Sequence, residues 1–363
     1  MGKKIIIAGG GTGGHIFPAI AIANAMKKMD RTLDILFVGA NGKMEMEKIP
    51  QAGYPIKGID IAGYNRSSML KNFTLPFKLI RSFTQVRRIF GEFKPNAAIG
   101  VGGYSSFPVL RYAQAKNIPT FIHESNSFAG KSNILLAKKA NKIFVAASGM
   151  EKFFPKEKIQ LSGNPVRATI RKTIQREEGI AFFGLNPSDT TVLATGGSLG
   201  AKSINEAIHN SIGAFQEHNL QLIWQTGKPF LPKAKEAAEA WKNIWANDFI
   251  DQMEYAFAAA DIVISRAGAM AIAELCVVGK PVIFVPYPHA AEDHQTVNAQ
   301  HLVYKNAGIL IKDAEAVEVL VPEIINLAEN KKKQEELIRN ISSLAIADAD
   351  EVIARTILQS IDK

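Results

Sequence analysis

Short apolar runs alternate along the first half of the chain with longer stretches in which apolar residues recur every three or four positions. The short runs predict strands at 4–8, 33–38, 97–101, 119–123 and 143–146. The periodic stretches predict helices at 17–29, 108–116 and 131–139. Strands that alternate with helices form βαβ units, so this half predicts a parallel sheet with helices on its faces.

The same alternation begins again after a turn at Gly163, Asn164 and Pro165. Beyond this turn we predict strands at 191–195, 221–225, 248–250, 261–265 and 281–286. We predict helices at 202–215 and 269–278, and a last helix that runs from a cap at Asp348 to Ile361. The chain is therefore expected to be an α/β protein with two Rossmann-like halves that divide after residue 165.

The composition supports a folded protein of about two domains. Of the 363 residues, 47% are hydrophobic and 21% are charged, which excludes disorder as the main state. A single cysteine, Cys276, excludes a disulfide framework and a cysteine-based zinc site, and it fits a reducing cytoplasm. No apolar run reaches the roughly 18 residues of a membrane-spanning helix, so none is expected.

The net charge of +9 is unevenly distributed. Residues 1–165 hold 24 Lys and Arg against 9 Asp and Glu, a balance of +15, whereas residues 166–363 hold 19 against 25, a balance of −6. This asymmetry indicates an anionic polymer or surface facing the first half. Nucleic acid is the weaker candidate, because no RNA-type aromatic motif or zinc finger is present. An anionic membrane is the stronger one.

The segment 69–83 mixes aromatic and aliphatic residues with Lys and Arg, and Arg87 and Arg88 follow it. This composition is typical of a surface that inserts into a membrane interface while its cations meet lipid headgroups. The alternative is a helix that packs Ile80, Phe83, Val86 and Phe90 against a core and exposes a basic side.

Three glycine-containing loops each join a predicted strand to a predicted helix. The first, 8–15, formally contains G-x-G-x-x-G, but no acid follows the second strand, where a dinucleotide-binding protein needs one. A nicotinamide-dependent oxidoreductase is therefore disfavoured. The other two loops are 195–201 and 265–269, and neither has a Lys-Ser/Thr placed after G-x-x-x-x-G as in a P-loop. Each loop alone could be only a tight turn, but three together favour a phosphate-bearing ligand at helix N-termini.

Six motifs give this sequence its resemblance to a known family. They occur in order, and the resemblance covers nearly the whole chain. They lie at 10–19, 102–108, 123–126, 163–167, 196–201 and 265–269. Together they resemble the MurG family, the N-acetylglucosaminyltransferases that complete lipid II in peptidoglycan synthesis. The resemblance implies a GT-B fold, in which two Rossmann-like domains with parallel sheets face a central cleft. It also implies an inverting transfer from UDP-N-acetylglucosamine to the C4 hydroxyl of undecaprenyl-pyrophosphoryl-N-acetylmuramoyl-pentapeptide (lipid I).

The resemblance also implies where the chain's parts act. Residues 1–165, with the helix at 346–363 packing back on them, would face the acceptor and the membrane, and 166–345 would bind the UDP-sugar. The protein would then be peripheral on the cytoplasmic side of the cell membrane, and other cell-wall enzymes are possible partners. No cofactor or metal is expected. The D-x-D at Asp348 and Asp350 is interpreted as capping and charge, so helix N-termini and Arg167 would meet the charge on the leaving UDP.

The family's functional residues map onto matching positions of this chain. His15, at a helix N-terminus that disfavours imidazolium, would be the general base for the sugar hydroxyl or its positioner. Donor contacts are expected at Thr12, Gly13, Gly14, Asn126, Arg167, Ser198, Ile250, Ala269, Met270, Glu274 and Gln295. Acceptor contacts are expected at Tyr104, His123 and Glu124.

Structural roles remain open for several of these positions. His15 could merely bond a backbone group, Ser198 could be a helix N-cap, and Arg167 could form an ion pair at the domain junction. Two positions depart from the family, since Leu199 and His294 stand where glutamine is frequent. Alternative functions are a GT-B transferase for another lipid such as diacylglycerol, and a UDP-sugar epimerase or hydrolase. A non-catalytic binding protein is the least favoured.

Overall fold

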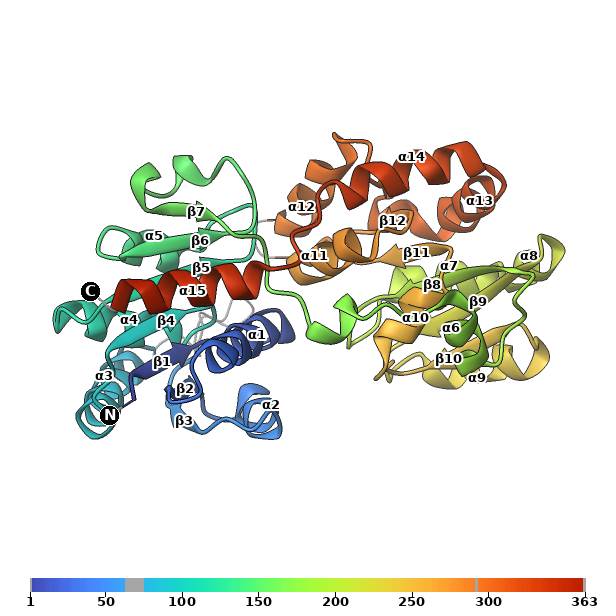
Figure 1. Ribbon diagram of the computed structural model, residues 1–363. Helices are drawn as coiled ribbons and strands as arrows, with labels where there is room; N and C mark the ends of the chain where they lie inside the picture. The colour runs from blue at the N-terminus through green and yellow to red at the C-terminus, as the bar shows by residue number, and fades with distance from the viewer. Residues whose placement is uncertain (1, 63–74, 291–292, 362–363) are drawn as a thin grey trace. The chain divides into compact units, whose positions relative to one another are not determined.

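The computed structural model describes residues 2–62, 75–290 and 293–361, and the chain forms two compact units (Figure 1). Unit 1 comprises Met1–Arg167 and Ala347–Lys363, and unit 2 comprises Ala168–Ile346. Each unit is built on a sheet in which every strand pair is parallel. The predicted α/β class with two parallel sheets is confirmed.

Unit 1 contains a seven-stranded sheet in the order β3-β2-β1-β4-β5-β6-β7. The strands are β1 (Lys4–Ala8), β2 (Asp34–Ala40), β3 (Ile56–Ile59), β4 (Ala97–Gly100), β5 (Thr120–Glu124), β6 (Lys142–Val145) and β7 (Ile159–Leu161). The helices are α1 (Gly13–Met29), α2 (Glu45–Gln51), α3 (Leu75–Phe93), α4 (Ser106–Ala115), α5 (Lys131–Ala137) and α15 (Ala349–Ile361). The strands β3 and β7 were not predicted, because these short edge strands include Lys57, Gly58 and Gln160 and form no apolar run.

Successive residues of β1 face opposite layers of helices. Ile6 and Ala8 belong to a core shared with α3, α4 and α5, whereas Ile5 and Ile7 belong to a core shared with α1 and α15. A strand that is covered on both faces must be apolar at every position, which explains the unbroken run in the sequence. Figure 1 shows α1 and α15 side by side, and Ile353 and Ile357 of α15 are fully buried there.

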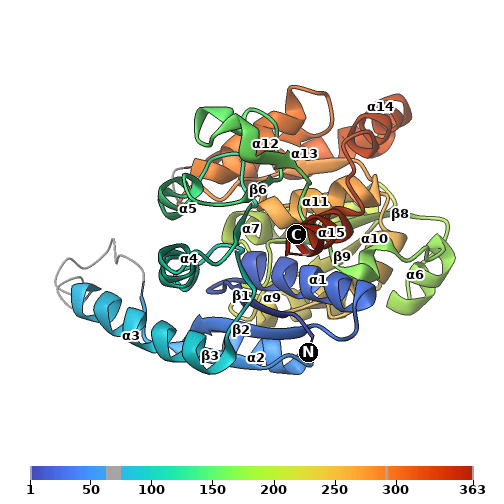
Figure 2. The same cartoon turned by 60° about the vertical axis from the view of Figure 1, so that its left-hand side comes forward.

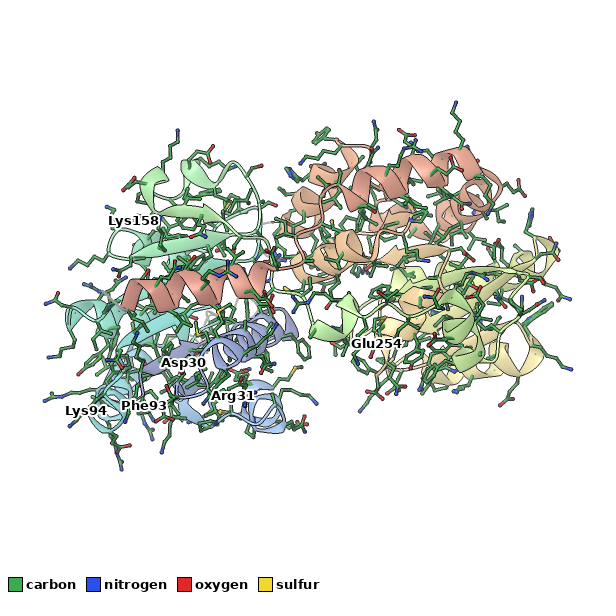
Figure 3. The ribbon with its side chains drawn as sticks, viewed as in Figure 1. Asp30, Arg31, Phe93, Lys94, Lys158 and Glu254 are labelled. Carbon is green, nitrogen blue, oxygen red and sulfur yellow. The ribbon has the colours of Figure 1, made fainter. Side chains whose placement is uncertain are left out.

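The helix α3 runs beside β3 at the edge of unit 1 (Figure 2). It ends at Phe93, because Lys94 has a φ of +54°. The ammonium nitrogen of Lys4 lies over the Phe93 ring, 5.4 Å from its centroid. Figure 3 labels Phe93 and Lys94 at this end of the helix. The opposite end of α3, around Phe77, lies near the carboxyl ends of β2 and β3.

Unit 2 contains a six-stranded sheet in the order β10-β9-β8-β11-β12-β13. The strands are β8 (Thr190–Thr195), β9 (Leu220–Gln225), β10 (Ile244–Asn247), β11 (Ile262–Ser265), β12 (Val282–Phe284) and β13 (Ile309–Leu310). The helices are α6 (Arg176–Phe183), α7 (Lys202–Asn210), α8 (Ile212–Glu217), α9 (Leu231–Ala240), α10 (Met253–Ala259), α11 (Ala269–Val278), α12 (His294–Val303), α13 (Ala316–Glu329) and α14 (Lys331–Ser342).

Two predictions for unit 2 were wrong. The strand expected at 248–250 lies earlier, because Ile244 and Ala246 bury alternate side chains and pair with β9, and 248–250 form the loop that follows. The single helix expected at 202–215 is interrupted at Ser211, whose φ of −123° leaves the helical region. The short strand β13 was also not predicted.

Both sheets change the direction of their strand order at one place. In unit 1, β2 and β3 lie on one side of β1 and β4 to β7 lie on the other, so the switch lies between β1 and β4. In unit 2 it lies between β8 and β11. Ligands of open α/β sheets bind outside the carboxyl ends of the strands at such a switch point. The three glycine loops follow β1, β8 and β11, and Gly102 and Gly103 follow β4, so the topology supports a ligand site in each unit.

Candidate active site

The loop that follows β1 is held by a buried carboxylate. Glu45, at the start of α2, is 1% exposed and accepts hydrogen bonds from Gly11 N–H at 2.8 Å and Ala40 N–H at 3.0 Å. A Cβ at Gly10 would lie 2.2 Å from this carboxylate, and Gly11 has a φ of +87°. Glycine is therefore required for this loop shape, and Glu45 occupies one of the loop's N–H groups.

The helix α1 begins directly after this loop. Thr12 is its N-cap residue with an extended backbone, and Gly13 and Gly14 are its first two residues. The first N–H groups of a helix have no acceptor within the helix and lie at the positive end of its dipole. This placement suits the expected contacts of Thr12, Gly13 and Gly14 with a sugar or pyrophosphate oxygen, which stay predictions.

His15 lies in the first turn of α1, and the loop orients its ring. Its Nδ1 is 3.1 Å from the carbonyl oxygen of Gly10. A carbonyl only accepts, so Nδ1 carries the proton in this contact and Nε2 keeps its lone pair. A Cβ at Gly102 would lie 2.6 Å from Nε2, so glycine at this position leaves room for the ring. The arrangement enables His15 to take a proton at Nε2.

The loop that follows β4 packs against the loop that follows β1. A Cβ at Gly103 would lie 2.3 Å from the carbonyl oxygen of Gly10, so the two backbones approach closely. Ser106 Oγ donates to the carbonyl oxygen of Ala8 at 2.8 Å and ties α4 to the end of β1. Tyr104 lies on this loop with 49% of its surface exposed. Tyr104 and His15 are therefore brought to the same edge of the sheet.

His123 and Glu124 end β5 and are buried. His123 Nε2 lies 3.3 Å from the carbonyl oxygen of Gly163, and burial lowers the pKa of its ring to about 4, so the ring is neutral at pH 7. Glu124 accepts from Asn126 N–H at 3.1 Å and from Gly130 N–H at 3.0 Å. Glu124 therefore holds the loop that carries Asn126, whereas His123 contacts the motif at 163–167. The expected acceptor contacts of both residues stay predictions.

Arg167 is the last residue of unit 1, and its guanidinium carbon lies 6.0 Å from the ring centroid of Phe17 on α1. Asn164, three residues earlier, donates from Nδ2 to the carbonyl oxygen of Ser125 at 3.0 Å. The motif at 163–167 is therefore anchored to the same edge of unit 1 as Asn126. The expected donor contacts of Asn126 and Arg167 stay predictions.

In unit 2 the loop that follows β8 is a tight glycine turn. Gly197 and Gly200 have φ of +83° and +76°, and Gly200 N–H donates to the carbonyl oxygen of Gly197 at 3.0 Å. Because this turn precedes the helix, α7 begins only at Lys202 with Ala201 as its N-cap residue. The suggestion that Ser198 caps the helix is wrong. Ser198 lies on the exposed turn instead.

Gln225, at the end of β9, is 2% exposed and all of its amide groups are bonded. Its Nε2 donates to Thr195 Oγ1 at 3.1 Å and to the carbonyl oxygen of Gly197 at 2.9 Å, and its Oε1 accepts from Ile250 N–H at 3.0 Å. One buried side chain thus joins the glycine turn to the loop after β10. Because the N–H of Ile250 is occupied, only its carbonyl could make the expected contact with uracil, which stays a prediction.

The loop that follows β11 opens α11. Gly268 is the N-cap residue, Ala269 and Met270 are the first two residues of the helix, and their N–H groups suit an anion. Glu274 lies four positions after Met270 and therefore on the same side of α11. Its side chain is largely buried, with the residue 8% exposed. The structure places these three predicted donor contacts on one helix.

Arg266 and Gln295 bond segments of unit 2 that follow α11 in the chain. Arg266 Nη1 donates to the carbonyl oxygen of Val285 at 2.9 Å and pairs with Asp313, which ties β11 to the segment after β12. Gln295 Oε1 accepts from Tyr287 N–H at 3.0 Å. The Gln295 carbonyl is thus occupied, and its NH₂ group is suited to donate to a sugar hydroxyl.

The predicted membrane segment 69–83 falls partly on residues 69–74, which lie outside the described residues. On α3, Phe77 is 76% exposed and Ile80 is 65% exposed, while Val86 and Phe90 are buried. The buried-helix alternative was therefore wrong for Ile80 and right for Val86 and Phe90. Among the residues described, no helix is both long and apolar enough to cross a membrane.

Across 2–62, 75–290 and 293–361, no three His, Cys, Asp or Glu side chains gather in a group that could hold a metal ion. Asp350 of the D-x-D is 5% exposed in the first turn of α15. This placement suits the charge of an acid near a helix N-terminus.

The sequence did not indicate Glu45, Gln225 or Arg266 as site residues. Glu45 stands in an alternating stretch that resembles a surface helix, and its partner Gly11 is 34 residues away. Gln225 is one polar residue at the end of an apolar strand. A polar residue that ends an apolar strand is the local sequence signal that could have indicated Gln225 as a site residue.

Both halves of the chain match models of one family. The Glycosyltransferase family 28 N-terminal domain matches residues 5–145, and the Glycosyltransferase family 28 C-terminal domain matches residues 191–353. A curated relative from Phocaeicola vulgatus is 51% identical over 99% of this chain and 97% of its own length. It is named UDP-N-acetylglucosamine–N-acetylmuramyl-(pentapeptide) pyrophosphoryl-undecaprenol N-acetylglucosamine transferase.

Solved structures show the same fold. The crystal structure of MurG from Acinetobacter baumannii has a TM-score of 0.78 and 27% identity, and the match covers 98% of this chain and 99% of that chain. The calicheamicin glycosyltransferase has a TM-score of 0.72 at 12% identity, over 99% of this chain and 98% of that chain, and it supports the fold alone. The predicted GT-B fold is confirmed.

Proposed function

This chain belongs to the MurG family within glycosyltransferase family 28, and we propose that it transfers N-acetylglucosamine from UDP-N-acetylglucosamine to the lipid-linked N-acetylmuramoyl-pentapeptide. The reaction converts lipid I to lipid II in peptidoglycan synthesis. The full-length likeness to a transferase of that name carries the proposal. The loops at the two switch points supply the groups that its chemistry needs.

His15 is the general base of the proposed mechanism. The C4 hydroxyl of the acceptor gives its proton to His15 Nε2 while its oxygen attacks the anomeric carbon of the donor sugar. The bond between that carbon and the phosphate oxygen breaks, UDP leaves, and the configuration inverts. The contact between Nδ1 and Gly10 supports this role, because it leaves Nε2 as the basic atom.

Unit 2 binds the donor in this proposal. The N–H groups of Ala269 and Met270 at the start of α11, together with Ser198, meet the diphosphate. Glu274 accepts from the ribose hydroxyls, because a carboxylate offers two acceptor oxygens. The carbonyl of Ile250 accepts from the uracil N–H, since its own N–H is bonded to Gln225.

Unit 1 binds the acceptor and faces the membrane. Asn126 bonds sugar hydroxyls, Thr12, Gly13, Gly14 and Arg167 add contacts to donor or pyrophosphate oxygens, and Tyr104 contacts the acceptor. Gln295, which belongs to unit 2, also bonds a sugar hydroxyl. The exposed Phe77, Leu79 and Ile80 of α3 support a peripheral position on the anionic cytoplasmic leaflet. Changing Phe77 and Leu79 to Asp is expected to weaken binding to anionic liposomes, and intact binding would remove α3 as the contact.

The test is UDP release from UDP-N-acetylglucosamine, measured with and without a short-chain lipid I analogue. Release only with the analogue is the expected result. Release without any acceptor indicates a hydrolase or an epimerase instead. Release with diacylglycerol but not with the analogue indicates a transferase for another lipid.

A further inference from the structure

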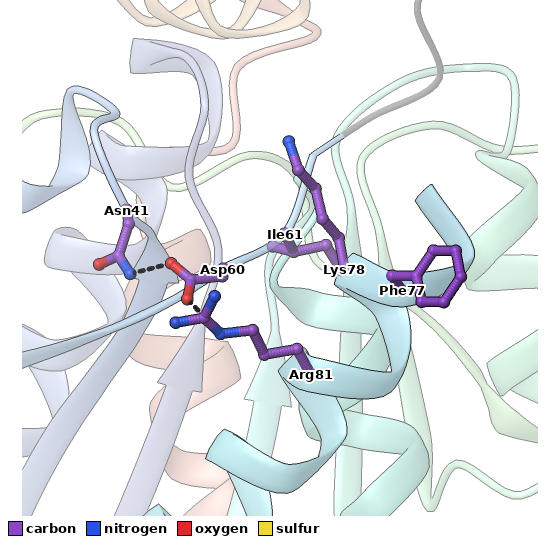
Figure 4. Close-up of a pocket in the computed structure, with 6 residues that line it drawn as sticks. All are labelled: Asn41, Asp60, Ile61, Phe77, Lys78 and Arg81. Atoms are coloured by element: carbon purple, nitrogen blue, oxygen red, sulfur yellow. Dashed lines mark hydrogen bonds and ion pairs between the residues drawn. The ribbon is translucent and has the colours of Figure 1, made fainter. Parts of the chain in front are cut away.

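A pocket of about 600 Å³ lies at the carboxyl ends of β2 and β3, under the first turns of α3 (Figure 4). It is lined by Asn41, Asp60, Ile61, Phe77, Lys78 and Arg81. The proposed mechanism uses none of its polar residues. Its volume is in the range of small-molecule sites, roughly 300–1,000 Å³.

One wall of the pocket is built around the Asp60 carboxylate. Asn41 Nδ2 donates to Oδ1 at 2.7 Å, Gln85 Nε2 donates to Oδ2 at 2.9 Å, and Arg81 Nε lies 2.9 Å from Oδ2. The hydrogen bonds from Asn41 and Gln85, with the charge of Arg81, hold the pKa of Asp60 below its usual range. Gly58 leaves space for Asn41, because a Cβ there would overlap its side-chain oxygen. Asp60 therefore stays ionised and holds Arg81 in place.

The two cations of the pocket belong to one side of α3. Lys78, Arg81 and Gln85 follow one another at three- and four-residue intervals, so they form a stripe on the side that meets Asp60. In the described part of the chain, Lys78 Nζ has no hydrogen-bond or ion-pair partner, and Asp60 is the partner of the Arg81 guanidinium through Nε. One carboxylate and two cations leave the lining with one positive charge. The pocket can therefore accept one anionic group.

The pocket lies on the same edge of the same sheet as the loop that carries His15. The strands β3, β2 and β1 are neighbours in that order. Adjacent strands are about 4.8 Å apart, so the ends of β3 and β1 are separated by roughly 10 Å. An extended peptide spans about 3.3 Å per residue, so a pentapeptide reaches roughly 16 Å and its C-terminus can enter the pocket.

We propose that this pocket binds the peptide of the lipid-linked acceptor and that Lys78 and Arg81 recognise the C-terminal carboxylate of that peptide. This inference rests on the proposed function, because it assumes an acceptor with a pentapeptide. Muramic acid carries its peptide on the oxygen next to the accepting hydroxyl, so the peptide starts beside His15. Ile61 and Phe77 supply apolar walls for small side chains along its path.

A lipid phosphate is the other anionic group that could reach Lys78. Two features favour the peptide. The volume exceeds what one headgroup phosphate needs, and the net lining charge is +1. A fixed guanidinium beside an ammonium is also a common carboxylate-binding arrangement.

The experiment compares two detergent-soluble acceptor analogues that differ only in the C-terminal carboxylate of the pentapeptide, which is free in one and amidated in the other. The values of kcat and KM are measured for the unchanged protein, Lys78→Gln and Lys78→Glu. Lys57→Gln is the matched control, because Lys57 is exposed on β3 and does not line the pocket. The KM for UDP-N-acetylglucosamine is measured in every case.

We expect Lys78→Gln to raise the KM for the free-carboxylate acceptor about three- to tenfold, with a larger rise for Lys78→Glu. The amidated acceptor, the donor KM and the control should show little change. An equal rise for both acceptors would assign Lys78 to a phosphate, and no rise would also overturn the peptide site. If the unchanged protein transfers to neither acceptor, the proposed function itself fails, which separates the two failures.

Discussion

The glycine loops that begin the two sheets have related geometry, but they are held by side chains of different charge. In unit 1, Glu45 accepts two backbone N–H groups, one of them from Gly11. In unit 2, Gln225 accepts one N–H from Ile250 and donates to the carbonyl oxygen of Gly197. Both residues are almost fully buried, and both join a glycine loop to the end of a neighbouring element.

This difference bears on what each loop can bind. A carboxylate consumes N–H donors and places a negative charge 2.8 Å from the loop, which opposes an anion at Gly11. The first loop is then better suited to a neutral hydroxyl beside His15, with anions limited to the start of α1. An amide adds no charge, so the second loop remains suited to a diphosphate. The comparison supports acceptor chemistry in unit 1 and donor binding in unit 2.

The largest effect is expected from His15→Ala. Loss of a general base lowers kcat by about 10²- to 10⁴-fold, while the KM for UDP-N-acetylglucosamine stays nearly constant because the proposed mechanism assigns no donor contact to the His15 side chain. Steady-state UDP release gives both values. His218→Ala, an exposed histidine of unit 2, is the control. A raised donor KM with normal kcat would assign His15 to donor binding, and it would contradict the assignment of acceptor chemistry to the first loop.

Acid should destabilise unit 1 through His123. Burial lowers its pKa to about 4 in the folded protein, from 6.5 in the unfolded chain, so the unfolded chain binds more protons between these values. Stability from this group is complete above pH 6.5 and is lost as the pH falls toward 4, by up to about 3 kcal/mol. Urea unfolding across this range should show a smaller pH dependence in His123→Gln. An identical dependence would show that His123 does not titrate this way.

Glu45→Gln tests whether the Glu45 carboxylate holds the first glycine loop through its hydrogen bonds to Gly11 and Ala40. An amide has one acceptor oxygen and turns its NH₂ group toward one of the two N–H donors, so a buried N–H loses its partner. The expected cost is about 1–3 kcal/mol in the free energy of unfolding, with a lower kcat and an unchanged donor KM. Glu47→Gln, on the exposed side of the same helix, is the control. Full stability and full activity in Glu45→Gln would contradict the role of this carboxylate.

Gln225→Glu tests the comparison directly, because it places a negative charge beside the second loop, as Glu45 does beside the first. A carboxylate cannot donate to Gly197, and its charge repels the donor diphosphate. We expect the KM for UDP-N-acetylglucosamine to rise about tenfold, and more at low salt, with a smaller change in kcat. Gln216→Glu on the exposed side of α8 adds the same charge elsewhere in unit 2. An equal rise in both variants would point to net charge alone.

The parts predicted from sequence are those with a local physical pattern. Central strands such as β1 and β8 are buried on both faces, so they stand out as apolar runs, and the glycine loops reveal the turns between strand and helix. The family and its transferase activity followed from six spaced motifs and were confirmed. The edge strands β3 and β7 lack such runs. The alternative that Ser198 caps the helix was wrong because two left-handed glycines delay the start of α7.

The roles of Glu45 and Gln225 in holding the glycine loops could not be predicted, because the residues that they bond are distant in sequence. Glu45 and Gly11 are 34 residues apart, and Gln225 and Ile250 are 25 residues apart. The local pattern shows that Gln225 ends an apolar strand, but it does not show which distant backbone groups either side chain bonds. The burial of His123 and Glu124 is a similar case, because their motif was interpreted as a contact surface. Their assigned roles, like those of the other site residues, stay predictions.

The return of α15 to unit 1 has a consequence for synthesis on the ribosome. Ile353, Ala354 and Ile357 complete the core around α1, but they follow the whole of unit 2 in the chain. At about 5–20 residues per second, translation of unit 2 delays their arrival by on the order of 10–40 s. During that time the apolar side of α1 that α15 later covers is open to water and to chaperones. Unit 2 can therefore be the first to mature, although unit 1 is begun earlier.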